Sequence, residues 1–346
     1  MKYPGLIFIC LLAIQPALAR VKDFVFSGHA VKPGTRASFE VKLPNPDGDS
    51  ALLPFTVIHG RKAGPVLGLI AGIHGYEYPP IMTLQALPAH IDPQELTGTL
   101  LILHIANVAA FSGRSVYLNP ADKKNLNRSF PGNAGGSITE RIAHFIATTV
   151  FSRCNYIIDN HGGDASEDLH GYAGYYRYGS QTAVSGEMAA ATGFDWITPA
   201  DIKPGPGEHS MYCNREAAMQ NIPAITIEYG KLGNVSQEDI RVYTTALLRV
   251  IRYLRMLPGT PPPANQPMYI NTRASIKSNH TGIIHTTMKS GELVRKGMKL
   301  GFITGFTGQH LEDIISPVDG VIIYLLATPP VNKGETLFSF GVLPGP

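Results

Sequence analysis

One apolar run that ends abruptly at a glycine-containing turn does most to constrain how this chain can fold. Residues 65–71 have the composition of a fully buried β-strand, and a helical pattern starts near Pro79. Gly72 and Gly75 break the run, because glycine lets the backbone bend at no steric cost. In open α/β sheets, the turn between a buried strand and the next helix is where ligands bind. We therefore expect an α/β sheet with a ligand site at this turn.

Strands and helices continue to alternate as far as residue 256. Further strands are expected at residues 55–59, 100–106, 156–158 and 224–227, after a turn-rich, β-like segment that begins at residue 21. Helices are expected at residues 79–87, 138–150, 183–192, 209–220 and 238–256. Ser137 and Glu140 have the spacing of a capping box at the start of the second of these helices. This order predicts an α/β domain with a mostly parallel sheet.

The composition changes after residue 257. Residues 258–267 form a proline-rich linker, and helical periodicity is absent beyond it. Residues 268–346 contain short apolar segments separated by glycines, which is typical of a small all-β module. We expect two folded parts, residues 20–257 and 268–346, which agrees with a length of 346 residues.

The first 19 residues are expected to be a signal peptide. Lys2 precedes an apolar run, and residues 17–19 form a small-x-small cleavage pattern. An N-terminal anchor helix is the alternative, although the run is too short to span a bilayer comfortably. We expect export to the periplasm or the medium, without membrane attachment after cleavage. A net charge of +3 is too small to indicate a nucleic-acid partner.

Two cysteines, Cys154 and Cys213, remain in the expected mature chain. An exported protein with two cysteines can form a disulfide, but the sequence leaves open whether the two residues come close in space. Neither belongs to a Cys-x-x-Cys pair, so a thiolate metal site is not expected.

Polar residues with metal-ligand chemistry follow two of the expected strands. His74 and Glu77 lie on the glycine-containing turn, three residues apart, and His161 follows the strand at 156–158. Two histidines and one carboxylate that leave a position for water are the pattern of a catalytic zinc site, here one ion per chain. Asp159 is placed to fix a histidine tautomer from behind. A His-x-x-Glu pair alone is also common on polar loops that bind no metal. A site with two histidines and one carboxylate also accepts divalent ions other than zinc.

Three further segments offer catalytic and binding groups. Glu228 follows a buried strand, where it can act as a general base, although a surface salt bridge is the alternative. Arg128 and Asn127 lie in a polar, turn-rich segment and suit a substrate carboxylate. Arg114 is a candidate for stabilising an oxyanion, with a solvated loop as the alternative.

Residues 74–77, 125–132, 159–161 and 227–230 occur in an order that resembles the succinylglutamate desuccinylase/aspartoacylase family. This family belongs to the zinc-carboxypeptidase-like superfamily, so the resemblance implies a mixed sheet flanked by helices. It also implies zinc on His74, Glu77 and His161, Glu228 as base, Asn127 and Arg128 on a substrate carboxylate, and Arg114 on the oxyanion. The family's usual polar residue before the glutamate is replaced here by Tyr76, which predicts a bulkier or more apolar side of the pocket.

The C-terminal module resembles a biotinyl/lipoyl-like barrel through residues 291–297 and 316–320. A carrier of that kind needs a lysine at the tip of an exposed hairpin. Residues 305–314 occupy that place and contain no lysine. An acyl-carrier role is therefore disfavoured, and we expect the module to be structural, near the entrance of the pocket.

Together these patterns predict an exported zinc-dependent amide hydrolase, a deacylase of N-acyl amino acids or related small carboxylate-bearing amides. A zinc carboxypeptidase acting on peptides or cell-wall fragments is the nearest alternative. A non-catalytic ligand-binding protein on the same scaffold is a third, though the base and all three ligands are present. The expected partner is a small amide or a short peptide, and the oligomeric state is left open.

Overall fold

The computed structural model describes residues 21–45, 48, 50–205, 207–260 and 266–343. The predicted signal peptide and residues 261–265 of the predicted linker lie outside these ranges. Within them, no helix is both long enough and apolar enough to cross a membrane.

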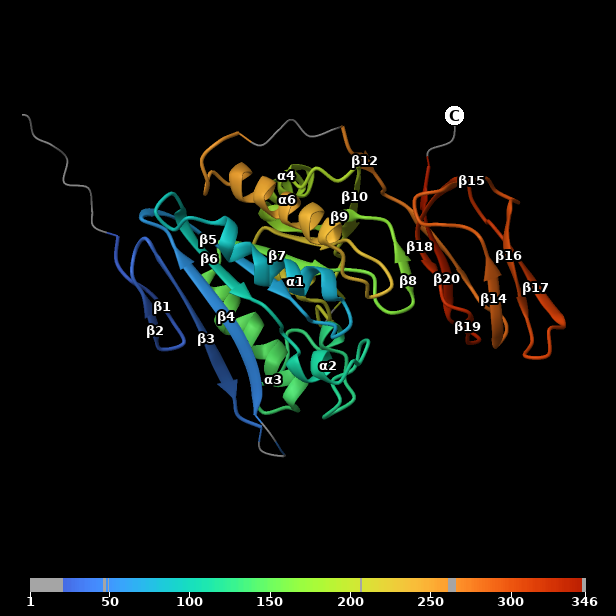
Figure 1. The fold of residues 1–346 in the computed structure, drawn as a ribbon, viewed down its shortest axis with the longest axis horizontal. Coiled ribbons are helices and arrows are strands. Elements are labelled where there is room, and N and C mark those ends of the chain that lie inside the picture. Colours follow the sequence, from blue (N-terminus) through green and yellow to red (C-terminus); the bar gives the residue numbers. More distant parts are fainter. Residues whose placement is uncertain (1–20, 46–47, 49, 206, 261–265, 344–346) are drawn as a thin grey trace, which may run out of the picture.

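A nine-stranded mixed sheet forms the centre of the larger part of the molecule (Figure 1). In spatial order its strands are β12 (Met268–Tyr269), β10 (Trp196–Asp201), β9 (Tyr172–Arg177), β11 (Ala224–Glu228), β7 (Tyr156–His161), β5 (Lys62–Ala71), β6 (Thr97–Leu103), β4 (Ala51–His59) and β3 (Thr35–Leu43). Strands β11, β7, β5 and β6 are parallel to one another, whereas β9 and β4 run antiparallel to their neighbours β11 and β6. The predicted mixed α/β sheet is confirmed.

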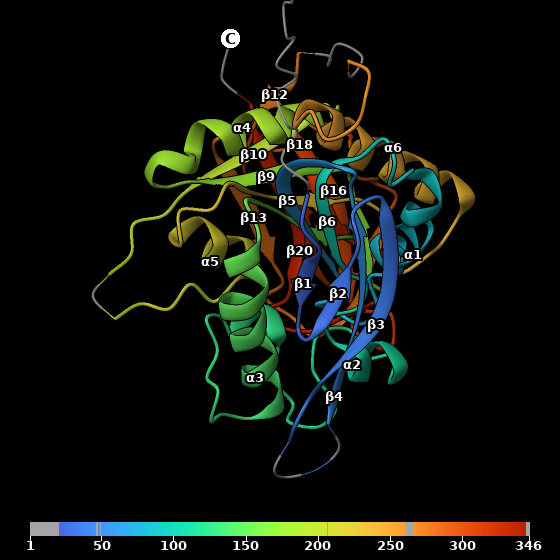
Figure 2. The same ribbon diagram turned by 90° about the vertical axis from the view of Figure 1, so that its left-hand side faces the viewer.

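Helices cover both faces of this sheet, as its buried strands require. Helices α1 (Tyr78–Ala86), α4 (Thr182–Ala191) and α6 (Gln237–Tyr253) pack on one face. Helices α3 (Ile138–Phe145) and α5 (Cys213–Met219) pack on the other, together with the hairpin of β1 (Phe24–Phe26) and β2 (His29–Val31). Figure 2 shows α3 and α5 on the opposite side of the sheet from α1 and α6.

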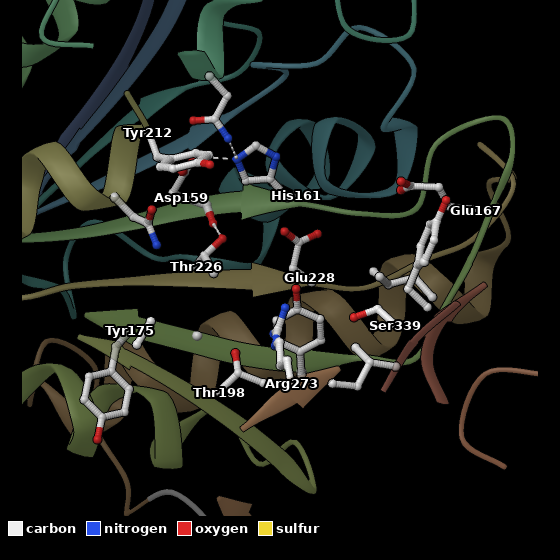
Figure 3. A pocket seen from close by; sticks show the side chains of 18 of the residues that line it. Asp159, His161, Glu167, Tyr175, Thr198, Tyr212, Thr226, Glu228, Arg273 and Ser339 are labelled. Carbon is white, nitrogen blue, oxygen red and sulfur yellow. Dashed lines mark hydrogen bonds and ion pairs between the residues drawn. The ribbon is translucent and has the colours of Figure 1, made fainter. Parts of the chain in front are cut away.

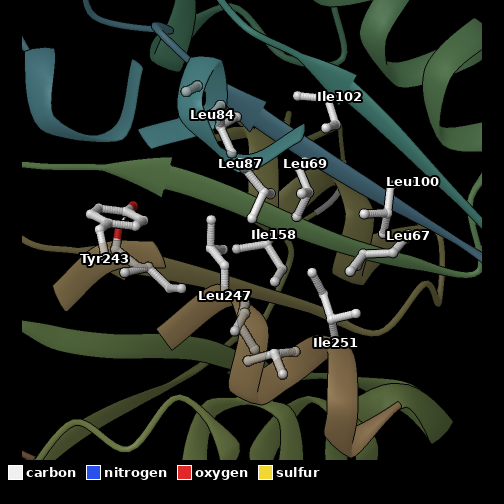
Figure 4. Close-up of a cluster of buried hydrophobic side chains, with 14 of the residues drawn as sticks. Leu67, Leu69, Leu84, Leu87, Leu100, Ile102, Ile158, Tyr243, Leu247 and Ile251 are labelled. Atoms are coloured by element: carbon white, nitrogen blue, oxygen red, sulfur yellow. Dashed lines mark hydrogen bonds between the residues drawn. The ribbon is translucent and has the colours of Figure 1, made fainter. Parts of the chain in front are cut away.

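Alternate residues along the central strands supply the two cores. Leu69 of β5 belongs to the core beneath α1 and α6, where Leu84 and Leu247 meet it (Figure 4). The next residue, Ile70, points to the other face and joins Ile142 of α3. Successive side chains of a strand point to opposite faces, so a run buried on both sides is continuously apolar.

Several element boundaries differ from those expected. The predicted helix at 138–150 is α-helical only to Phe145 and then continues as a π turn, Ile146–Val150, and a 3-10 turn, Phe151–Arg153. Its predicted capping box is present. Helix α5 begins at Cys213 rather than at 209, because Met211 exchanges backbone hydrogen bonds with Phe130, at 3.0 and 3.3 Å. Strands β9 and β10 were not predicted.

The C-terminal module is all-β, as predicted, and consists of two sheets around its own core. One sheet has the order β13 (Arg273–Lys277), β20 (Thr336–Val342), β18 (Gly320–Leu326), β15 (Leu293–Val294). The other has the order β17 (His310–Ile315), β16 (Lys299–Thr304), β14 (Gly282–Thr286), β19 (Pro330–Val331). The hairpin between β16 and β17 carries the strongly exposed Phe306, 77% accessible, in place of a carrier lysine.

The module is attached to the α/β domain by backbone pairing and by an apolar contact. Strand β8 (Glu167–Leu169), from the α/β domain, pairs with β18 of the module. An apolar cluster spans the junction and contains Tyr172, Trp196, Ile270, Val321 and Ile323. Residues 268–269, expected to open the module, instead add β12 to the edge of the large sheet.

Both cysteines in the described part of the chain are free thiols. Cys154 is partly buried and Cys213 fully buried, at the start of α5. Burial raises the pKa of the Cys154 thiol to about 12, so this residue behaves as an inert apolar group.

Candidate active site

The candidate site lies where three neighbouring parallel strands end. Strands β5, β7 and β11 run in the same direction, and His161 lies opposite Glu228 in the register. Their carboxyl ends therefore meet at one edge of the sheet. Helix α2 (Val108–Ser112) packs directly on the turn after β5, because a Cβ on Gly75 would lie 2.3 Å from the Ala110 carbonyl carbon. Gly72 adopts a φ of +67°, which glycine reaches without strain.

His74, Glu77 and His161 converge at this edge and are buried, with 8%, 4% and 3% of their surfaces exposed. The Glu77 carboxylate lies between the two imidazoles: Oε1 is 2.5 Å from His74 Nδ1 and Oε2 is 2.8 Å from His161 Nδ1. One ligand atom from each residue lies within 4.8 Å of the others. Burial opposes ionisation of Glu77, but the two imidazoles outweigh it and lower its pKa to about 2.

The outer nitrogens of both imidazoles have partners of their own. His161 Nε2 lies 3.2 Å from Asp159 Oδ1, and His74 Nε2 lies 3.2 Å from Asn125 Oδ1. The Asn125 oxygen can hold a proton on Nε2 of His74 and leave the Nδ1 lone pair for a metal ion. Asp159 Oδ1 faces His161 as a charge but forms no hydrogen bond. Burial opposes a charge on His161, yet Asp159 and Glu77 raise its pKa well above the usual range. This donor set fits a divalent cation, and Asp159 lies behind the ligand as expected.

Asn127 and Arg128 come from the polar segment that the sequence singled out. They lie on a short 3-10 turn, Leu126–Arg128, and the Asn127 Nδ2 is 3.5 Å from His161 Nε2. The Cys213 backbone N–H donates to Asn127 Oδ1 at 3.0 Å, which fixes the amide. The Arg128 guanidinium lies 4.6 Å from the centre of the Tyr212 ring. Both residues line the same cavity as the histidines.

Arg114, the predicted oxyanion-stabilising residue, lies away from Asn127 and Arg128. It is exposed, has a φ of +50° and follows helix α2 (Val108–Ser112). It is not among the described residues that line the cavity. Tyr117 lines the cavity instead, with its ring 5.2 Å from that of His74 and its hydroxyl donating to Glu167 Oε1 at 3.2 Å. No motif in the sequence pointed to Tyr117.

Tyr76, expected to make one side of the pocket bulkier, is also outside the described cavity lining. Its ring packs against Tyr78, with 4.9 Å between ring centres. Tyr172, Tyr175 and Tyr176 of β9 do line the cavity. The aromatic residues of the cavity therefore come from β9 and from Tyr117, Tyr212 and Tyr324 rather than from the turn after β5.

Glu228 is the last residue of β11 and lies beside His161 in the cavity (Figure 3). Burial raises its pKa to about 8, helped by Glu77 and Asp159 and only partly opposed by His161 and Arg273. Glu167, also in the cavity, has its pKa raised to about 8 by burial and by Asp164. A carboxyl group poised near neutral pH beside a metal-binding cluster is suited to proton transfer.

The cavity has a volume of about 1040 Å³ and is bounded by both parts of the molecule. The module supplies several of its lining residues: Arg273, Ile323, Tyr324, Glu335, Thr336 and Ser339. Sequence patterns did not identify any of these, because the residues come from β13, β18, β20 and the turn before β20, which only the tertiary fold brings to the cavity. The site can hold a metal ion, a proton-transferring carboxylate and an anionic ligand together.

Comparisons with known proteins agree with this geometry. A family model described as the succinylglutamate desuccinylase/aspartoacylase catalytic domain matches residues 63–254. The N-alpha-acetyl-L-2,4-diaminobutyric acid deacetylase of Halomonas elongata is 25% identical over 312 residues, which cover 86% of this chain and 89% of that protein.

Solved structures share the fold over nearly the whole chain. A succinylglutamate desuccinylase/aspartoacylase from Rhodobacter sphaeroides superposes with a TM-score of 0.79 at 22% identity, over 90% of this chain and 96% of that one. The product-bound ectoine utilization protein EutE from Ruegeria pomeroyi gives a TM-score of 0.80 at 24% identity, over 89% and 95% of the two chains. The similarity includes the C-terminal module.

Proposed function

This chain belongs to the succinylglutamate desuccinylase/aspartoacylase family, and we propose that it is a zinc-dependent amide hydrolase. Its substrates in this proposal are N-acyl amino acids or related small amides that carry a carboxylate. One observation carries the proposal: Glu228 lies in the same cavity as the buried cluster of His74, Glu77 and His161. The deacetylase from Halomonas elongata, similar over most of both chains, supports cleavage of an acyl amide.

In the proposed reaction, each of these residues has a separate role. His74, Glu77 and His161 would hold the zinc ion, which would supply polarisation of the scissile carbonyl and activation of water. Glu228 accepts the proton of the attacking water and delivers it to the leaving amine. Because its pKa lies near 8, the carboxyl group can both take up and release a proton near neutral pH.

Asn127 and Arg128 hold a substrate carboxylate in this proposal. The Arg128 guanidinium is kept in place by the Tyr212 ring and by its own donation to the Asn127 carbonyl, at 2.7 Å. A planar fork of donors suits a carboxylate. Arg114 receives no substrate contact here, since it does not line the described cavity.

A carboxypeptidase acting on short peptides is a second candidate, favoured by the size of the cavity. About 1040 Å³ is at the upper end of the range for small-molecule sites, and it leaves room for a peptide. We also propose export through the N-terminal segment 1–19, which would bring the enzyme to such substrates.

Metal analysis combined with a substrate panel tests the proposal. Purified protein should contain about one zinc per chain and release free amine from N-acyl amino acids, and a chelator should abolish this activity until zinc is restored. Preference for short peptides would select the carboxypeptidase. Bound zinc without turnover on any amide or peptide would favour the binding-protein alternative. Failure to bind zinc at all would contradict the proposed metal site.

A further inference from the structure

One tyrosine hydroxyl group is buried behind the candidate site, on the helix α6 that covers this face of the sheet. Tyr243 has no exposed surface and packs in the core with Leu84 and Leu247 (Figure 4). It is not among the described residues that line the cavity, so it does not meet a ligand there. A hydroxyl group buried in an apolar core needs a hydrogen-bond partner within the protein. Its partners therefore indicate what this hydroxyl does.

The partners of the Tyr243 hydroxyl are carbonyl groups at the ends of two neighbouring strands. The hydroxyl donates to the His161 carbonyl at 3.2 Å and to the Ile227 carbonyl at 3.1 Å. His161 is the last residue of β7, and Ile227 directly precedes Glu228, the last residue of β11. Because a hydroxyl group has one hydrogen, the two carbonyls share it. The same group thus joins the strand end that carries a predicted metal ligand to the strand end that carries the predicted base.

This contact lies where the regular pairing of β7 and β11 ends. The last paired residues in the register are His161 and Glu228. Beyond them, the Tyr229 N–H donates to the same His161 carbonyl at 3.2 Å. Residues 162–163 and Gly230 are glycines, which have no side chains with which the two segments could pack. The Tyr243 hydroxyl therefore adds a side-chain bond at the point where the alignment of the two strands depends on few contacts.

The Tyr243 hydroxyl is held as a donor in a fixed direction. Burial, and after it the negative charges of Glu228, Glu77 and Asp159, raise the pKa of this hydroxyl well above its usual value, so it keeps its proton. Backbone carbonyls can only accept a hydrogen bond. The ring stands edge-on to the Tyr229 ring, with 6.3 Å between the ring centres and an angle of 82°. The core thus limits how the donor can move.

We propose that Tyr243 is a positioning residue, whose hydroxyl fixes Glu228 relative to the cluster of His74, Glu77 and His161 by joining the ends of β11 and β7. The proposal rests on the proposed amide hydrolase function, in which Glu228 must reach a water molecule at this cluster. A general base acts over a donor–acceptor distance of about 2.6–3.2 Å, and a displacement of about 1 Å can lower a rate about 10²-fold. A buried hydrogen bond can therefore influence the chemical step without any contact with the substrate.

A double-mutant cycle tests whether Tyr243 acts through Glu228. Tyr243→Phe removes the hydroxyl and keeps the ring, so we expect kcat for N-acetyl-L-alanine to fall about 10-fold, with a change in KM below about 3-fold. In the Glu228→Gln background no base is left to position, so the same substitution should lower the remaining rate less than about 3-fold. A purely structural effect of Tyr243→Phe would instead lower both rates by the same factor.

Tyr253→Phe is the matched control for the loss of a hydroxyl group. Tyr253 also belongs to α6, and its hydroxyl donates to Glu187. Neither residue is among the described residues that line the cavity. We expect kcat and KM of this variant to stay unchanged in both backgrounds. Zinc content and thermal unfolding, measured on every variant, show that each protein is loaded with metal and folded at the assay temperature.

Hydrogen exchange, followed by mass spectrometry of peptides, gives a second measurement that needs no turnover. Deuterium uptake at residues 160–163 and 227–230 should be faster in Tyr243→Phe than in the wild type, because the hydrogen bonds between the two strand ends open more often. Tyr253→Phe should leave uptake in both segments unchanged. If the wild type hydrolyses no amide of the panel, the proposed function is contradicted, and the exchange comparison alone decides whether the hydroxyl joins the strand ends.

Three results would overturn the assignment. The first is an equal loss of rate for Tyr243→Phe in the wild-type and Glu228→Gln backgrounds, and the second is no loss in either. The third is unchanged deuterium uptake in both segments. Normal hydrolysis by the wild type together with any of these results leaves the proposed function standing and removes only the role of Tyr243.

Discussion

At the scale of single residues, the proposed catalysis depends on Glu228. Replacing Glu228 with Gln keeps the shape of the side chain but removes the proton acceptor. We expect turnover to fall roughly 10²–10⁴-fold, the usual contribution of a general base, while zinc content stays unchanged. Steady-state rates and metal analysis on the same preparation check this. Activity near that of the wild type would contradict the role of Glu228 as base.

Arg128 should act on affinity rather than on the chemical step. Arg128→Ala removes the guanidinium that lies over Tyr212. For N-acetyl-L-alanine, we expect KM to rise about 10- to 100-fold with a smaller change in kcat, because a charge-assisted hydrogen bond is lost. N-acetyl-L-alaninamide, which lacks the carboxylate, serves as the control and should be affected little. If both substrates lose efficiency equally, Arg128 does not bind the carboxylate.

At the scale of elements, the start of α3 depends on an ionised Glu140. The carboxylate accepts from Lys124 at 2.7 Å and from the Ser137 hydroxyl and backbone N–H at 2.9 Å. The bond to Lys124, followed by those from Ser137, lowers the pKa of Glu140 to about 2. These contacts tie the segment that carries Asn127 and Arg128 to the helix.

The sign of the pH effect follows from this lowered pKa. Glu140 stabilises the fold fully above its unfolded pKa of 4.5 and loses that contribution as pH falls toward about 2. Glu140→Gln should cost roughly 0.5–1 kcal/mol of unfolding free energy at pH 7. The difference from wild type should shrink between pH 4.5 and 2, as measured by denaturant titration. Glu95→Gln, at an exposed position, is the control, and a pH-independent difference for Glu140→Gln would contradict the argument.

Elements whose signal is local were predictable from the sequence. The strand at 65–71 and the turn after it are encoded within about a dozen residues, and the same holds for the strand that ends at Glu228. Strands β9 and β10 were missed because their tyrosines, glycine and proline break both the apolar run and the alternation. The start of α5 depends on the distant Phe130, which no local pattern reveals.

At the scale of the whole molecule, the part of the site that escaped prediction is the part made by two domains. The metal-binding cluster needs only two neighbouring parallel strand ends, those of β5 and β7, so the order of apolar runs and polar residues was enough to find it. Glu167 lies on β8, which pairs with the module, and Arg273 belongs to the module itself, so both reach the cavity through the junction of the two domains. This junction joins segments that are far apart in the sequence. Asp168 and Ser290, which are hydrogen-bonded across it, are separated by 122 positions.

The docking of the module can be tested with two matched valines. Val321 belongs to the apolar cluster at the domain junction, whereas Val294 belongs to the core of the module alone, and both are nearly fully buried. Val321→Ala and Val294→Ala should each cost about 1–3 kcal/mol of stability, since each leaves a similar cavity.

Only Val321→Ala should change function, because it loosens the junction that places residues of the module in the cavity wall. We expect a several-fold rise in KM for N-acetyl-L-alanine in this variant and an unchanged KM in Val294→Ala, both measured well below their unfolding temperatures. Equal effects of the two substitutions on KM would mean that a general loss of stability, rather than the position of the module, governs substrate binding. An effect confined to Val321 would show that the two domains form a single binding site, whose specificity can change through residues that never touch the substrate.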